Sequence, residues 1–326
     1  MDPARPALDA PFPTPIDRRD GELIGPWREP RQMLAEQTYD DHASIHDDAT
    51  ARKLGFQGGT IEGPTHFSQF APLCFALWGP RWFESGCISA HYRTAVYEGE
   101  KVRAHVAEVD GERTSSVIWM EKEDGSEVLR GTASIGPDHP TTELDQRLAQ
   151  LATPGDLVVL EGVRVGARGE RLGVRMGADQ HMGRLYPFSL NQKLERITEP
   201  SPWYRAGDAA ASPFGRAIIP MEMISVLVNH VSGETPFYTK GPVVGLFADQ
   251  EIRLVDGPLL VDEPYEIDRE VVAISGSRRT ESLWILTRVY RPGSNAVIAS
   301  MLLNSALLKD SYADYEAEHR RLYGGA

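Results

Sequence analysis

The stretch YDDHASIHDDATARKLGFQGGTIEG, residues 39–63, places a carboxylate, Asp41, five positions before an imidazole, His46. Side chains on one face of a helix are three or four positions apart. The spacing therefore predicts a loop at a helix end that directs both side chains into one cavity. A run of small residues follows and ends at Gly63, directly before Pro64 and an apolar segment.

The same pattern recurs 158 positions later, in EPSPWYRAGDAAASPFGRAIIPM (199–221), without a gap. The matched pairs are Asp41 with Glu199, His46 with Tyr204, Ala51 with Ala209, Phe56 with Phe214, Ile61 with Ile219 and Gly63 with Met221. The shift also carries VYEGE (96–100) onto LVDGP (254–258), after which the second copy gains about ten residues. We interpret this self-similarity as an internal duplication.

Each copy has the same predicted order of elements. The polar loop leads into a helix that is apolar nearly all round, at 64–79 and at 220–232, as expected of a buried helix. Strand patterns follow, such as the alternation of Val102, Ala104 and Val106 with charged neighbours. The predicted fold class is α+β, with each helix wrapped by the antiparallel sheet that follows it.

The chain is expected to divide into five parts. These are an extended N-terminal arm (1–20), a first unit (21–136), a linker (137–175), a second unit (176–310) and a C-terminal helix or tail (311–326).

The bulk composition excludes several classes of protein. The 326 residues are 41% hydrophobic and 25% charged, which suits a globular chain of two domains or one duplicated fold. A net charge of −13 argues against nucleic-acid binding. The two cysteines, Cys74 and Cys87, form neither a disulfide framework nor a C-x-x-C pattern. The N-terminus lacks the apolar core of a signal peptide, and no apolar run is long enough to span a membrane, so the expected location is cytoplasmic.

The first copy resembles the MaoC-like (R)-specific enoyl-CoA hydratase/dehydratase family. The matching residues are Asp41-His42-Ala43-Ser44-Ile45-His46-Asp47-Asp48, then Ala51, Gly55-Phe56 and Ile61-Glu62-Gly63. The family motif has Asn-Pro where this chain has Ala43-Ser44, one more residue before its Gly-Phe, and a histidine at the position of Glu62. The resemblance implies a hot-dog fold, in which a curved sheet wraps a central helix, and two copies imply a double hot dog.

The resemblance also implies roles for the residues. Asp41 and His46 would hold the water that attacks C3 of an enoyl thioester, and the Gly63 amide would stabilise the enolate oxygen from a helix start. Gly63→Val is then expected to lower turnover with the fold intact. Glu62, His66 and His91 are candidate substrate-binding residues. The alternatives are a helix-capping or surface role for Glu62 and structural roles for both histidines. The set Asp41, His46 and Glu62 matches no metal-ligand spacing, so no metal or cofactor is expected.

The second copy has Glu199 and Tyr204 in place of the pair, and Met221 in place of the glycine. Tyrosine, with an ordinary pKa near 10, is a poor base at neutral pH. We interpret this copy as a degenerate site that completes the sheet and shapes the acyl pocket. The predicted function is a hydratase or dehydratase acting on an acyl thioester, with coenzyme A as the expected carrier. A hot-dog acyl-CoA thioesterase and a non-catalytic acyl-binding protein are the alternatives, and a further homodimer is left open.

Overall fold

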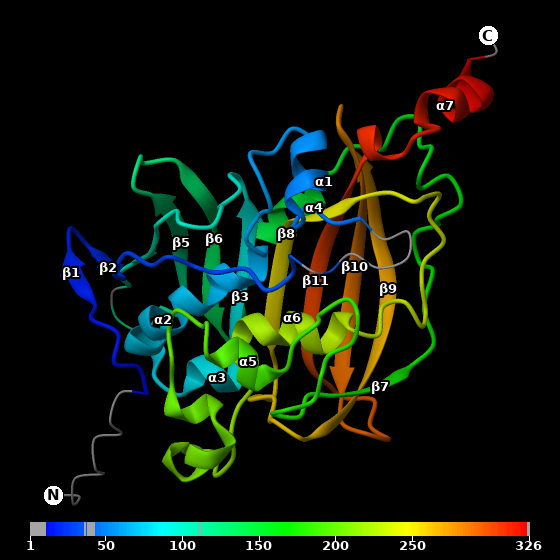
Figure 1. Ribbon diagram of the computed structural model, residues 1–326. Coiled ribbons are helices and arrows are strands. Elements are labelled where there is room, and N and C mark those ends of the chain that lie inside the picture. Colours follow the sequence, from blue (N-terminus) through cyan, green and yellow to red (C-terminus); the bar gives the residue numbers. More distant parts are fainter. Residues whose placement is uncertain (1–10, 36, 38–42, 110, 112, 325–326) are drawn as a thin grey trace, which may run out of the picture.

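The structure is a computed structural model that describes residues 11–35, 37, 43–109, 111 and 113–324. Within these residues, eleven strands form one antiparallel sheet (Figure 1). Across the sheet the order is β1 (Asp17–Arg19), β2 (Glu22–Ile24), β4 (Val102–Ala107), β5 (Ser115–Lys122), β6 (Glu127–Ile135), β3 (Gly86–Tyr92), β8 (Gly245–Leu254), β11 (Val297–Leu308), β10 (Thr280–Tyr290), β9 (Pro264–Gly276) and β7 (Leu172–Arg175).

The sheet consists of two equivalent halves that meet between β3 and β8. From this seam outward, the first half runs β3-β6-β5-β4-β2 and the second runs β8-β11-β10-β9-β7. At the seam His91 pairs with Asp249, and these two residues are 158 positions apart. Equivalent residues of two copies face each other in this way when a twofold axis relates the copies. The double hot-dog fold and the duplication predicted from the sequence are confirmed.

Two central helices lie on one face of this sheet (Figure 1). The first comprises the 3-10 helix η1 (Gly63–Phe70) and the α-helix α2 (Ala71–Trp78), and the second is α6 (Met221–Asn229). The predicted helix at 64–79 is thus present but changes type at residue 71. Pro72 explains the change, because it lacks the N–H that would bond to the Ser68 carbonyl in a continuous α-helix.

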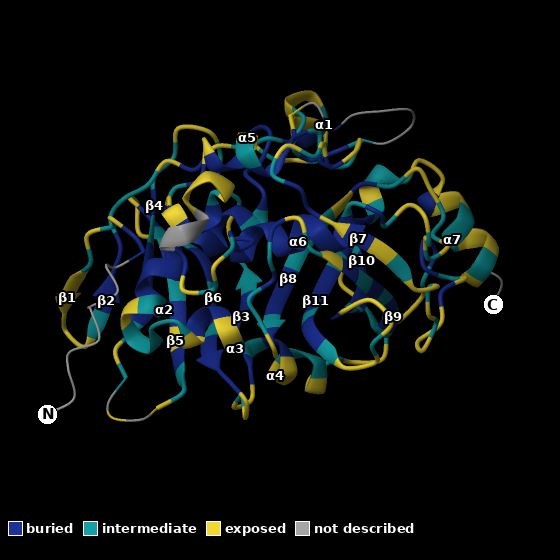
Figure 2. Ribbon diagram, turned by 90° about the horizontal axis from the view of Figure 1, so that it is seen from below, coloured by how far each residue is buried: buried dark blue, intermediate teal, exposed yellow. Residues whose placement is uncertain are grey.

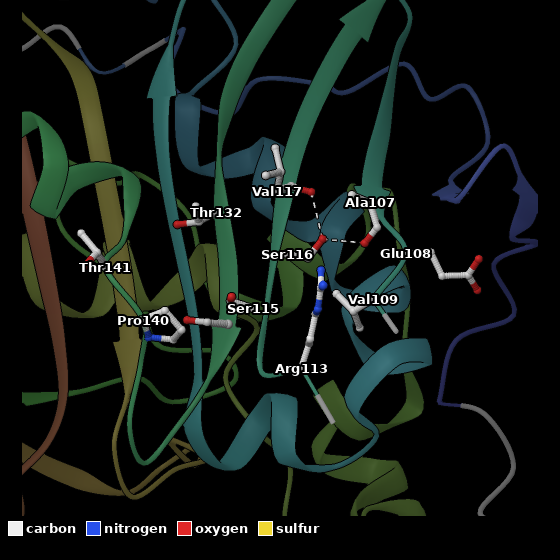
Figure 3. Close-up of a pocket in the computed structure, with 11 residues that line it drawn as sticks. Ala107, Glu108, Val109, Arg113, Ser115, Ser116, Val117, Thr132, Pro140 and Thr141 are labelled. Carbon is white, nitrogen blue, oxygen red and sulfur yellow. Dashed lines mark hydrogen bonds between the residues drawn. The ribbon is translucent and has the colours of Figure 1, made fainter. Parts of the chain in front are cut away.

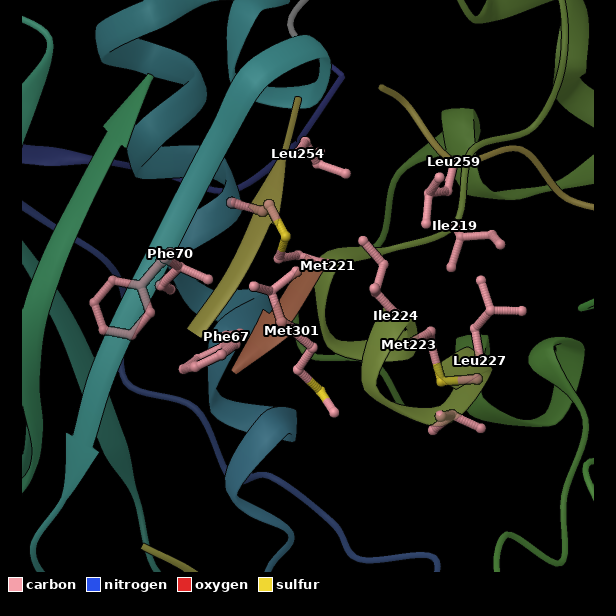
Figure 4. Close-up of a cluster of buried hydrophobic side chains, with 14 of the residues drawn as sticks. Phe67, Phe70, Ile219, Met221, Met223, Ile224, Leu227, Leu254, Leu259 and Met301 are labelled. Carbon is pink, nitrogen blue, oxygen red and sulfur yellow. The ribbon is translucent and has the colours of Figure 1, made fainter. Parts of the chain in front are cut away.

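The hydrophobic core lies between these helices and the sheet (Figure 4). Every residue of α6 is buried, and Phe67 and Phe70 of η1 are completely enclosed. Met301 of β11 and Leu254 of β8 come from the opposing sheet. The predicted alternation in β4 is also present, since Val102, Ala104 and Val106 are all inaccessible to solvent. Burial therefore concentrates in the sheet and the central helices, and exposed residues in the peripheral loops (Figure 2).

Shorter elements surround this framework. They are α1 (Asp48–Lys53), α3 (Arg81–Ser85), α4 (Glu143–Ala149), α5 (Leu190–Leu194), α7 (Tyr315–Tyr323), η2 (Pro202–Tyr204), η3 (Ala206–Ala211) and η4 (Lys309–Ser311). The segment expected to be a linker contains α4, which begins with a capping box, and β7, which pairs with β9. The five-part division of the chain stays a prediction. None of the helices in the described ranges is long and apolar enough to cross a membrane.

Candidate functional site

The loop that carries His46 is held by the two acids that follow it. The Asp47 carboxylate accepts a hydrogen bond from the Thr50 amide at 2.8 Å and so caps α1. Asp48 accepts from the Gly59 amide, also at 2.8 Å, and joins the two ends of the loop. The Thr60 amide adds a 3.0 Å bond to the Ile45 carbonyl. These bonds fix the backbone on either side of His46.

The His46 ring is half-buried and has a defined tautomer. Its Nδ1 lies 2.7 Å from the Thr60 carbonyl oxygen, which can only accept a hydrogen bond. Nδ1 must therefore carry the hydrogen when the ring is neutral, and Nε2 keeps its lone pair. A histidine oriented in this way can accept a proton at Nε2. Asp41, its predicted partner, lies outside the described residues.

The chain runs directly from the His46 contact to the start of the first central helix. Two residues, Ile61 and Glu62, separate Thr60 from Gly63, the first residue of η1. Among the described residues, no acceptor is present for the Gly63 amide. An unpaired amide at a helix start carries the positive end of the helix dipole and can stabilise an oxyanion.

The structure gives Gly63 a packing role that the sequence did not reveal. A Cβ atom at this position would lie 2.7 Å from the Tyr92 ring, which is closer than atoms in contact can approach. Tyr92 is fixed in turn, because its hydroxyl donates to Gln250 at 2.9 Å. A larger side chain at Gly63 must therefore displace the Tyr92 ring, so we expect Gly63→Val to lower stability as well as turnover.

Glu62, which directly precedes η1, and His66, which lies within it, are both buried. Glu62 accepts from the Met33 amide at 2.8 Å and from the Thr65 hydroxyl at 3.4 Å, contacts that favour an anchoring role. Burial, together with the nearby positive charges of Lys193 and Lys122, lowers the pKa of His66 to about 3, so the ring is neutral. His66 Nδ1 has no hydrogen-bond partner in the described part of the chain.

His91 lies on the other face of the sheet. Side chains alternate along a strand, and the neighbouring Tyr92 packs against Gly63 and Phe67 on the helix side. His91 instead bonds to Asp249 at 2.8 Å, and Asp249 also pairs with Arg147 of α4 at 2.6 Å. The structure therefore places Glu62, Gly63 and His66 at or near the start of η1, connects His46 to Thr60 shortly before it, and places His91 on the opposite face of the sheet.

The counterparts in the second half are enclosed. Glu199 is 1% exposed and pairs with Arg28 through two hydrogen bonds of 2.7 and 3.0 Å; it also accepts from Thr14. Tyr204 packs against the rings of Phe12 and Phe83, with centroids 6.1 and 6.5 Å away. Burial raises the pKa of Tyr204 well above its ordinary value, and the charges of Glu222 and Glu199 add to this effect.

A buried ion pair, which the sequence analysis missed, lies where the two central helices meet. Lys193 Nζ of α5 donates to the Thr65 hydroxyl at 2.7 Å and lies 3.9 Å from Glu222 Oε1 in the first turn of α6. Glu222 is the one acid in the apolar segment PMEMISVLVNHVS (220–232). That isolated charge was the available signal, but its partner is distant in sequence.

Two surface cavities accompany these sites. One, of about 450 Å³, lies between residues 28–31 and 195–198, where Arg28 and Thr198 are among the lining residues. The other, of about 230 Å³, lies over β4, β5 and β6, where Ser116 donates to the carbonyl of Ala107 at 2.6 Å (Figure 3). Of the described residues that line these two cavities, none is a predicted site residue.

No protein-family profile matches the chain, and no curated protein sequence matches it. Several solved structures, however, match its fold. A MaoC domain protein from Chloroflexus aurantiacus, described as a dehydratase, matches with a TM-score of 0.54 at 14% identity, over 91% of this chain and 98% of that one. A MaoC-like dehydratase follows with a TM-score of 0.48 and 14% identity, over 93% of this chain and 99% of the other. A Mycobacterium tuberculosis protein described as a double hot dog has a TM-score of 0.48 and 9% identity, over 82% of this chain and 88% of that one. At such low identities a structural match shows the fold alone, and the match to the first of the three structures supports it. The chain has the double hot-dog fold of MaoC-like proteins.

Proposed function

We propose that this protein is a hydratase or dehydratase that adds or removes water across the C2=C3 bond of an enoyl thioester, with coenzyme A as the expected carrier. The observation that carries the proposal is the Nδ1 contact of His46 with the Thr60 carbonyl at 2.7 Å. It leaves Nε2 available as a base on a ring that is anchored at Thr60, three positions before Gly63. The description of the Chloroflexus aurantiacus protein as a dehydratase adds support.

In the proposed reaction, the His46–Asp41 pair holds one water molecule. His46 Nε2 accepts a proton from this water as its oxygen forms a bond to C3, and the C2=C3 π electrons move toward the thioester oxygen. The Gly63 amide donates to that enolate oxygen, which is worth about 3–4 kcal/mol of barrier in comparable oxyanion sites. Return of that proton from the His46–Asp41 pair to C2, as the thioester carbonyl re-forms, completes hydration and regenerates the base, and the reverse sequence is dehydration.

The enclosure of Glu199 and Tyr204 supports the proposal that the second half is catalytically silent. The Glu199 carboxylate is already bonded to Arg28, and the Tyr204 hydroxyl stays protonated at neutral pH. Neither group is arranged to activate a water molecule. The second half instead holds the loop of the first, because Ile45 packs with Val244 and Leu308.

The test is an assay with crotonyl-CoA that follows both enoyl absorbance and free thiol. Loss of absorbance without thiol release indicates a hydratase, thiol release indicates the thioesterase alternative, and binding without either indicates an acyl-binding protein. Asp41→Asn and His46→Ala should each lower turnover by about a hundred- to ten-thousandfold. The double variant should be little worse than either one, because the two residues act as a unit.

Tyr204→Phe and Glu199→Gln are the matched controls in the second half, with thermal melts to confirm folding. Turnover should be nearly kept in both. Loss of turnover in a well-folded Tyr204→Phe protein, with activity kept in His46→Ala, would place the active site in the other half.

A further inference from the structure

The first turns of the two central helices are joined by one ammonium group. Lys193 Nζ donates to Thr65 Oγ1 at 2.7 Å on η1 and lies 3.9 Å from Glu222 Oε1 on α6. All three residues are at most 4% exposed. Two residues of a 3-10 helix rise about 4 Å, so Thr65 lies about that far along the axis from Gly63. The ammonium of Lys193 is therefore bound to the same first turn of η1 that begins at Gly63, where the thioester is proposed to lie.

Neither oxygen of the Glu222 carboxyl group has a hydrogen-bond partner of ordinary geometry within the described ranges, although the Ser68 hydroxyl lies near it. Burial raises the pKa of Glu222 to about 7, although the charge of Lys193 opposes this shift, and the charge of Glu62 adds to it. A buried carboxyl without donors costs about 1–3 kcal/mol or more. Such a group is expected to meet a polar partner that belongs to neither helix.

The charges around this position select a neutral partner. A cationic group would meet the ammonium of Lys193, and an anionic group would meet the carboxylates of Glu222 and Glu62. A hydroxyl fits both neighbours, because it accepts from Lys193 and donates to Glu222. An oxygen about 2.8 Å from each would bridge their 3.9 Å separation at an angle of about 90°.

The ion pair is also close to the molecular surface. Ser68 lowers the pKa of Glu222 and so lies near its carboxyl group, and the Ser68 hydroxyl is 3.0 Å from Thr198 Oγ1. Thr198 lines the 450 Å³ cavity between residues 28–31 and 195–198. The hydroxyl groups of Ser68 and Thr198 therefore lie between Glu222 and this groove.

We propose that Glu222 and Lys193 form a specificity site that binds a hydroxyl group on the acyl part of the substrate, so that the preferred substrates are hydroxylated enoyl thioesters. This inference rests on the proposed function, because it takes the thioester to lie at the Gly63 amide. The second half would then contribute substrate selection to a reaction carried out by the first.

The experiment compares enoyl-CoA esters of one chain length, either plain or with a hydroxyl at successive positions of the acyl chain. For one position, wild-type kcat/KM should exceed that for the plain ester by about ten- to hundredfold, as for a hydrogen bond to a charged group. Glu222→Met and Lys193→Met should lose this preference. Glu222→Gln keeps an acceptor oxygen and should retain part of it. Ser225→Ala, one turn further along α6, should leave the preference unchanged.

Two results would overturn the inference: a wild type without preference at any hydroxyl position, or a preference that persists in a folded Glu222→Met protein. Calorimetric binding of the same esters separates the two proposals. If no ester is hydrated but the hydroxylated ester binds more tightly to wild type than to Glu222→Met, the reaction is wrong and the hydroxyl site stands. If turnover occurs without any difference in preference or binding, the reaction stands and the hydroxyl site is refuted.

Discussion

Glu222 should make the free energy of unfolding fall as pH rises. Its pKa is raised from 4.5 to about 7 in the folded protein, mainly by burial. The folded state therefore holds a proton that the unfolded state releases, and the stabilisation is complete below pH 4.5 and lost as pH rises through about 7. The difference of about 2.5 pH units, at about 1.4 kcal/mol per unit, amounts to about 3–4 kcal/mol. Glu222→Gln should remove this decline.

His66 should produce the opposite slope. Burial lowers its pKa from 6.5 to about 3, so its contribution to stability is complete above pH 6.5 and lost as pH falls toward 3. Between pH 4.5 and 6.5 both groups act, each at up to about 1.4 kcal/mol per unit, and their effects cancel in the wild type. Glu222→Gln should therefore become more stable with rising pH in this window, and His66→Gln less stable.

The measurement is urea unfolding of each protein at several pH values across this window, followed by tryptophan fluorescence. The difference between wild type and variant isolates one group, and Glu316→Gln, an exposed acid on α7, serves as the control. The double variant Glu222→Gln/His66→Gln should regain a nearly flat profile. Parallel profiles for wild type and both single variants would refute the assignment of these buried protonation states.

Three substitutions test the packing. Gly63→Ala should cost about 1–3 kcal/mol by overpacking against Tyr92, and less in a Tyr92→Leu background; equal melting temperatures for Gly63→Ala and wild type would contradict this contact. Phe12→Ala should cost about 3 kcal/mol in thermal melts, because this ring of the N-terminal arm is 7% exposed; an unchanged melt would mean that the arm is not docked. Arg28→Met should cost about 3–5 kcal/mol by leaving Glu199 buried and unpaired, and Glu199→Gln in the same protein should recover much of that loss; a cost that persists would assign it to Arg28 alone.

The sequence predicted those parts of the fold that depend on local pattern. The apolar runs located both central helices, and the shift of 158 residues reappears in the pairing of His91 with Asp249 across the seam. A sequence repeat of this kind identifies the equivalent strands of the two copies. It therefore also indicates which strands can pair with each other about a twofold axis, as β3 and β8 do.

Contacts between distant segments could not be predicted in the same way. Which face of β3 meets the helix depends on strand register, and a shift of one residue would exchange the environments of His91 and Tyr92. The isolated acid at Glu222 was visible in the sequence, but nothing local places Lys193 of α5 beside it. The packing of Tyr92 against Gly63 was hidden for the same reason, since the two residues meet only once the sheet has closed over the helix.

The two halves depend on each other at their candidate sites. The loop of the first half packs on the second through Ile45 and Val244, and the loop of the second packs on the first through Tyr204 and Phe83. Separating the halves would expose the paired edges of β3 and β8 as well as both loops. The second half, which we propose to be catalytically silent, would therefore still be needed to hold His46 in place. Under that proposal, this dependence would explain why the chain retains both units although only one copy has the acid–imidazole pair.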